Sequence, residues 1–140
     1  MGNVAIKSAA FAFIAMLSTG GCNWDVVTTR YETLAKFKDR GWLPKEILPP
    51  STRAILTENN LDFNVSYGHF EFEPKDVAVF LAKVKPGPPP RPSYSGWSDV
   101  VADYRDDGLS VWQYSEDRSH WALFCDLDAA RCQYSMWLDR

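Results

Sequence analysis

The sequence has little of what enzymes and metal proteins commonly use. It contains two histidines, His69 and His120, and neither belongs to a paired-histidine or cysteine–histidine zinc motif. It has no glycine-rich phosphate loop before a lysine, no nucleophile elbow and no helix with two histidines. An isolated histidine in a turn or at a strand start is typical of a solvated surface group. We therefore expect no enzyme activity, no cofactor and no bound metal.

A hydrophobic run long enough to cross a membrane is also missing. The longest apolar run covers nine residues, from Ala9 to Leu17, whereas a spanning helix needs about 20. Lys7 precedes this run, and the small residues from Ser18 to Gly21 follow it. A positive start, a short apolar centre and a small-residue exit are typical of a secretory signal. We therefore predict that residues 1–21 are a signal peptide.

Cysteine is scarce, and the three that exist suggest different roles. Gly20, Gly21 and Cys22 fit the box in which bacterial lipoproteins are cut and lipidated, although Thr19 stands where leucine is usual. Ordinary cleavage near Gly20 or Gly21, leaving an unmodified Cys22 thiol, is the alternative. Cys125 and Cys132 can form a disulfide with each other, which leaves Cys22 as the one cysteine without a disulfide partner. Lipidation would account for it. We predict a lipid-anchored envelope protein that faces the periplasm or the extracellular side.

Clustered positive charge is absent as well. Residues 22–92 hold ten lysines and arginines against nine acidic residues, and residues 93–140 hold four against nine. Phosphate binding depends on clustered cations, so we expect no nucleic-acid partner. The expected partners are the membrane, through the N-terminal lipid, and an envelope protein.

Residues 22–140 are long enough for one small domain. Thr29 and Glu32 have capping-box spacing, which favours a helix over residues 29–40, and Ser51 favours a second over 52–58. Apolar residues alternate over 61–67 as in a half-buried strand. At Gly68 this alternation changes phase, which indicates either a two-residue hairpin turn or a bulge.

Pro74 opens a third predicted helix, whose apolar residues recur at core-facing spacing up to Val84. Five prolines and a glycine make 85–92 an extended connector. Ser98 favours a short helical turn, and three strands are expected at about 109–115, 120–126 and 131–138. The second and third place Cys125 opposite Cys132, and one face of this meander is consistently apolar. The prediction is an α+β domain with about three short helices and a small antiparallel sheet: the C-terminal meander plus an N-terminal strand or hairpin.

Asp62 and Asn64 are the best candidates for a binding site. Both residue types are disfavoured in strands, and their spacing of two places them on the same face. They either cap the neighbouring loop or form a small binding spot. An enzyme would be favoured if these two residues and His69 lay in one cleft with Asp106 or Asp107. Asp126 and Asp128, which flank the last turn, are interpreted as turn residues, because a calcium loop needs further ligands.

Several short motifs lie between Arg30 and Val84: Arg30 and Tyr31; Gly41, Trp42, Leu43 and Pro44; Leu48, Pro49 and Ser51; Asn60, Leu61, Asp62 and Asn64; Phe70 and Phe72. This stretch resembles the YbbD head domain family of small exported bacterial proteins. The resemblance implies an envelope protein and supplies no catalytic residues.

The expected function is that of a non-catalytic binding module on the envelope. The alternatives are a periplasmic inhibitor or immunity protein, which would use the acidic C-terminal part to steer association, a structural envelope spacer and, less favoured, a small hydrolase.

Overall fold

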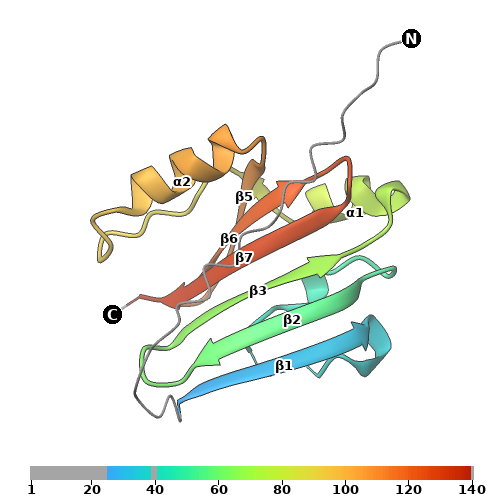
Figure 1. Cartoon of the computed structure of the whole chain (residues 1–140), viewed down its shortest axis with the longest axis horizontal. Helices are drawn as coiled ribbons and strands as arrows, with labels where there is room; N and C mark the ends of the chain where they lie inside the picture. Colours follow the sequence, from blue (N-terminus) through green and yellow to red (C-terminus); the bar gives the residue numbers. More distant parts are fainter. Residues whose placement is uncertain (1–24, 39–40, 140) are drawn as a thin grey trace.

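The computed structural model describes residues 25–38 and 41–139, so the predicted signal peptide, residues 1–21, and Cys22 lie outside the described residues. Within them the chain forms one sheet with the order β1-β2-β3-β7-β6-β5-β4, in which every neighbouring pair is antiparallel (Figure 1). The strands are β1 Val26–Thr33, β2 Arg53–Asn60, β3 Val65–Glu71, β4 Lys85–Pro86, β5 Ser110–Glu116, β6 Ser119–Asp126 and β7 Arg131–Leu138. The helices are α1 Val77–Leu81 and α2 Trp97–Asp106, and 3-10 turns cover Leu34–Lys36, Lys45–Ile47 and Pro74–Asp76.

The prediction of an α+β domain with about three helices is therefore wrong, because the described chain is mainly antiparallel sheet with two short α-helices. The helix expected over 29–40 is replaced by strand β1, and the helix expected over 52–58 by β2. Strand β1 as a whole is rich in β-branched residues, which are Val26, Val27, Thr28, Thr29 and Thr33, and β1 and β2 pair with each other along their lengths. Long-range pairing thus overrides the local helix signals.

The C-terminal meander is confirmed together with its register. Cys125 pairs with Cys132 across the β6–β7 hairpin, and the two form a disulfide with Cα atoms 4.1 Å apart. The β5–β6 hairpin sets Tyr114 opposite Trp121, as expected. The predicted helix after Pro74 is also present, as a 3-10 turn followed by the five residues of α1.

Gly68 marks neither a turn nor a bulge, so both sequence-based alternatives are wrong. It lies inside β3, between Thr57 of β2 and Tyr134 of β7. A Cβ atom at Gly68 would meet the Leu56 carbonyl oxygen at 1.9 Å and Tyr134 Cε1 at 2.8 Å. The chain needs glycine here because β2 and the Tyr134 ring approach its backbone so closely.

The strand predicted over 61–67 is correct for residues 65–67, which belong to β3, and wrong for residues 61–64 and for the face turned to the core. Residues 61–64 form the β2–β3 turn, and Leu61 and Phe63 are exposed. In β3 itself the side chains of Ser66 and Phe70 face the core, while Tyr67 faces solvent. The apolar alternation therefore indicated the wrong face, because a serine and a glycine occupy core positions beside Tyr134.

The sheet carries a hydrophobic cluster on each face. On one face Phe70, Leu123 and Tyr134 pack with Leu43 and Phe80 from the connecting segments. On the other face α2 packs over the β5–β7 half, where the ring centroids of Tyr104 and Phe124 are 4.0 Å apart. Figure 1 shows α2 beside this half of the sheet and away from β1.

The proline-rich connector runs along the outer side of β5. Lys85 and Pro86 form the short strand β4, and the Gln113 side-chain amide donates to the Pro86 carbonyl oxygen at 3.2 Å. Further along, Trp97 Nε1 donates to the Pro89 carbonyl oxygen at 3.0 Å. These contacts hold the connector against the sheet and position the start of α2.

Candidate functional site

A hollow of about 190 Å³ lies at the β1 edge of the sheet, on the face that carries the larger core. We call it the edge hollow. Thr29 and Tyr31 of β1 and Thr57 and Asn59 of β2 contribute to its floor, and Trp42 is among the residues that contribute from the segment after β1. Its remaining lining is mainly apolar. A concave, mostly apolar site with a few polar groups is the usual form of a binding pocket.

A buried chain of hydrogen bonds supports the floor of the edge hollow. Ser66 Oγ donates to Asn59 Oδ1 at 2.7 Å, so the Tyr134 hydroxyl, 2.8 Å from Ser66 Oγ, donates to that serine. Ser66 is fully buried and Tyr134 nearly so, and this burial raises the pKa of the Tyr134 hydroxyl well above its usual range. Asn59 lines the hollow, and the N–H groups of its side-chain amide are hydrogen-bond donors.

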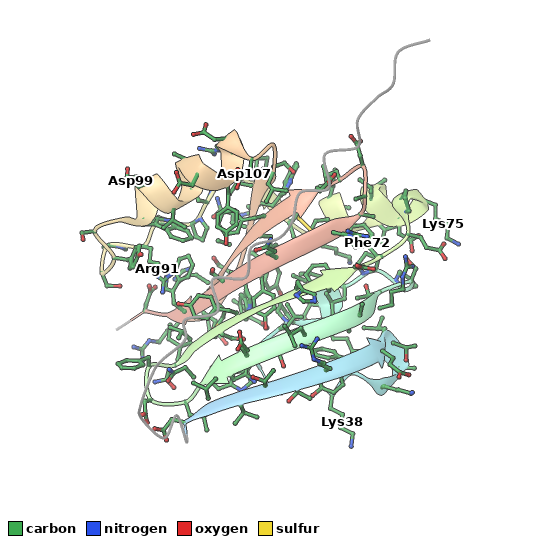
Figure 2. All side chains as sticks on the ribbon, in the orientation of Figure 1. Lys38, Phe72, Lys75, Arg91, Asp99 and Asp107 are labelled. Carbon is green, nitrogen blue, oxygen red and sulfur yellow. A yellow bond between two sulfur atoms is a disulfide. The ribbon has the colours of Figure 1, made fainter. Side chains whose placement is uncertain are left out.

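The size of the edge hollow limits what it can hold. Pockets for drug-sized ligands measure about 300–1,000 Å³, and the edge hollow is smaller than that. It therefore suits one side chain of a partner better than a whole ligand. Lys38 stands at its rim, and Figure 2 shows this side chain beyond β1, at the outer edge of the sheet.

The strand beside this hollow is an outer edge of the sheet. Among the described residues β1 pairs only with β2, so one side of its backbone is available for hydrogen bonds. β1 is eight residues long, and only Arg30 and Glu32 are charged. The opposite edge, β4, has two residues, of which one is Pro86. Natural proteins usually shorten an edge strand or break it with proline, as at β4, to prevent pairing with other chains. β1 lacks this protection.

The predicted binding residues Asp62 and Asn64 lie in the β2–β3 turn. Asn60 Oδ1 accepts hydrogen bonds from the backbone N–H groups of Asp62 and Phe63, at 3.1 and 3.2 Å, and Asn64 has φ 51°. A hydrogen bond with Asp25 raises the pKa of the Asp62 carboxyl. Asp62 and Asn64 also line a second, open hollow of about 450 Å³ together with Arg118 and Asp139.

The remaining candidates are scattered over the sheet. His69 lies in the middle of β3, and its burial lowers the pKa of the imidazole. Asp106 and Asp107 lie at the C-terminal end of α2, which covers the β5–β7 half of the sheet, whereas Asp62 lies in the β2–β3 turn (Figure 1). These residues do not meet in one cleft. Asp126 Oδ1 accepts a hydrogen bond from the Ala129 backbone at 3.1 Å, which fits its interpretation as a turn residue.

The structure brings together one set of residues that sequence reasoning missed. Ser115 Oγ lies 2.8 Å from His120 Nδ1, and His120 Nε2 lies 2.6 Å from Asp139 Oδ2. If the carboxylate accepts from Nε2–H, Nδ1 accepts the serine proton, which resembles a serine–histidine–aspartate triad with the two ring nitrogens exchanged, because in the triad Nε2 faces the serine and Nδ1 the carboxylate. The predicted hairpin already set Ser115 opposite His120, so the first contact could have been found in the sequence.

The surroundings of this set differ from those of a hydrolase site. Ser115 is exposed on the surface, and the Asp139 side chain is 54% exposed. Asp139 lines the second hollow, but Ser115 and His120 stand outside that lining. A nucleophile needs a site beside it where the substrate carbonyl can sit. The three residues fit better as a clamp that holds the end of β7 against the β5–β6 hairpin.

The described residues contain no group of three or more histidine, cysteine or acidic side chains that could hold a metal ion. No helix among them is long and apolar enough to cross a membrane.

Comparison with known proteins identifies a family for part of the chain. Residues 25–71 match the YbbD head domain, which confirms the resemblance seen in the sequence. This segment contains the whole lining of the edge hollow, from Val27 to Leu61, as well as β1, β2 and β3. No curated protein and no solved structure matches the chain.

Proposed function

With residues 25–71 belonging to the YbbD head domain family, we propose that this chain is a non-catalytic binding module of the bacterial cell envelope. Residues 1–21 export it, and lipid on Cys22 anchors it at the membrane. Its partner is an extended segment of another envelope protein. This segment adds to β1 as a further strand and places one side chain in the edge hollow.

The observation that carries this proposal is the long unprotected edge strand beside a hollow. In strand addition, main-chain hydrogen bonds supply affinity, and pockets for alternate side chains supply specificity. β1 offers eight residues of edge backbone, and the edge hollow lies next to its Thr29 and Tyr31 side chains. The strand and the whole lining of the hollow fall within the segment matched by the family. The Asn59 amide and the apolar walls favour an apolar side chain with one hydrogen-bond acceptor.

Two adjacent threonines allow a matched test. Thr29 lines the edge hollow, whereas Thr28 precedes it on the same strand and points to the other face, where it is exposed. A photo-crosslinking residue at Lys38, on the rim, should capture a discrete envelope protein in intact cells. Thr29→Trp fills the hollow and should abolish that adduct, while Thr28→Trp should preserve it. Circular dichroism establishes that both variants are folded.

Two results would count against strand addition at this site. One is the absence of any adduct from Lys38, and the other is an adduct that survives both tryptophan substitutions equally. Neither result bears on the lipid anchor, because the anchor is tested by a separate measurement. The mass of the mature N-terminus should show an acylated Cys22. An unmodified Cys22, or a start at another residue, would contradict lipidation.

A second candidate, an inhibitor of a periplasmic enzyme, is favoured by the surface of α2. Asp99, Asp103, Asp106 and Asp107 lie at the spacing i, i+4, i+7 and i+8, and all four are exposed. Figure 2 shows Asp99 and Asp107 on the outer side of this helix. Such a stripe steers a basic partner during association. If the captured protein is an enzyme, Asp103→Asn with Asp107→Asn should slow its association at low salt, and an unchanged rate would remove this candidate.

A further inference from the structure

Exposed apolar side chains gather at one end of the sheet. Of the eight large apolar side chains that are exposed in the described part of the chain, five lie there: Val26 37%, Val27 45%, Leu61 51%, Phe63 70% and Leu138 38%. They come from the start of β1, the β2–β3 turn and the end of β7, which lie together at the left of Figure 1. We call this group the apolar end.

The apolar end is held in place by the fold. The Asn60 side chain accepts hydrogen bonds from two backbone N–H groups of the β2–β3 turn, so the turn has a defined shape. It presents Phe63 as the most exposed of the eight side chains. A group of exposed apolar side chains at one end of a fold is a candidate contact with a partner or a membrane.

The start of the mature chain is tied to the same place. The Leu61 backbone N–H donates to the Asp25 carbonyl oxygen at 2.9 Å. Cys22 precedes Asp25 by three residues in the sequence, and three residues span at most about 11 Å. Trp24 lies between them in the sequence, and tryptophan is enriched at membrane–water interfaces. A lipid on Cys22 thus brings the apolar end to the membrane surface.

We propose that the apolar end rests on the phospholipid bilayer, with Phe63 and Leu61 inserted into the interfacial region beside the lipid anchor. This inference rests on the lipidation of Cys22 in the proposed function. It adds a defined orientation, in which the end of the sheet that carries Phe63 contacts the membrane and β1 extends away from the membrane. Val27 and Leu61 also line the edge hollow, so the hollow opens next to the membrane, while Thr29 and Tyr31 lie further along β1 and remain open to an envelope partner.

The charges at this end indicate which kind of surface fits. The carboxylates of Asp62 and Asp139 and the guanidinium of Arg118 line the second hollow beside Phe63. With acidic groups in excess of cationic ones, attraction to anionic lipid cannot drive the contact. Burial of the apolar side chains supplies the driving force, so anionic lipid should not strengthen the contact and salt should not weaken it.

Site-specific probes on the full lipidated protein test this orientation. The other two cysteines are paired, and Cys22 carries lipid, so an introduced cysteine is the single reactive thiol. Phe63→Cys and Val79→Cys are labelled with an environment-sensitive fluorophore and reconstituted in phosphatidylcholine vesicles. Val79 is the matched control, because it is 47% exposed and lies on α1 at the opposite end of the sheet.

The probe at position 63 should shift its emission to the blue, lose its quenching by aqueous iodide and become quenched by lipid-bound nitroxide. The probe at position 79 should stay accessible to iodide. A probe at 63 that remains open to iodide on vesicle-bound protein overturns the membrane contact and leaves the anchor intact. Shielding from iodide without quenching by nitroxide shows that protein covers the apolar end, and this result also overturns the membrane contact. Protein that does not float with vesicles and has an unmodified Cys22 overturns the anchor and this inference together.

Discussion

The sharpest stability prediction concerns Gly68, where two neighbouring strands and an aromatic ring converge. Replacement by alanine would place a Cβ atom 1.9 Å from the Leu56 carbonyl oxygen. It would also lie 2.8 Å from Tyr134 Cε1. Both neighbours are constrained: the oxygen belongs to the backbone of β2, and the Tyr134 hydroxyl is held by Ser66. The variant can therefore fold only if β2 and β3 separate locally.

The size of the effect follows from what the separation costs. Moving the strands apart by about 1 Å weakens one or two backbone hydrogen bonds, each contributing about 1 kcal/mol net. Overpacking against a fixed ring costs about 1–3 kcal/mol more. We expect Gly68→Ala to lower the free energy of unfolding by about 3 kcal/mol, a large fraction of the stability of a small domain.

Urea unfolding followed by tryptophan fluorescence, with the disulfide intact, measures this loss. At an m-value of about 2 kcal/mol/M the midpoint should fall by about 1.5 M. Gly96→Ala is the control, since its added Cβ would meet its nearest neighbour, Tyr94 Cε1, at 3.4 Å. It should change the unfolding free energy by less than about 1 kcal/mol. If Gly68→Ala also changed it by so little, the close approach of β2 to β3 would be refuted.

Two further predictions concern the C-terminal hairpins. Replacing Cys125 and Cys132 by alanine opens a loop with a sequence separation of 7 residues, which should cost about 2.5 kcal/mol in the chain-entropy model. Hydrogen exchange should then rise first in β6 and β7, and uniform protection in both proteins would contradict this. If the protein is non-catalytic, a fluorophosphonate probe should not label Ser115, despite the contact of this serine with His120. Labelling that disappears in Ser115→Ala would instead identify a serine nucleophile.

The part of the fold that could be predicted from sequence is the part with local contacts. In the β5–β6–β7 meander each strand pairs with the next one along the chain, and short turns join them. Turn length, alternation and the cysteine pair therefore all constrain one register, and the predicted register is the observed one. The same register set Ser115 opposite His120.

The N-terminal half depends on contacts between distant residues. β1 meets β2 only after a long connection, and β3 pairs with β7, which lies more than sixty residues later in the chain. Nothing in the local pattern of residues 29–40 reveals those partners, so the capping-box spacing indicated a helix. The edge hollow was missed for the same reason, because its two main strands were expected to be helical.

The sequence by itself determined the C-terminal hairpins, the cysteine pair within them and the likeness of the stretch from Arg30 to Val84 to a family, because each is a pattern among near neighbours in the chain. Tertiary structure alone decided that Ser66 and Gly68 face the core, that β1 is an open edge and that Phe63 stands exposed in the turn whose Leu61 contacts Asp25. These features arise where distant strands pack, and a small or polar residue becomes a core residue only when a partner such as Tyr134 is there to meet it.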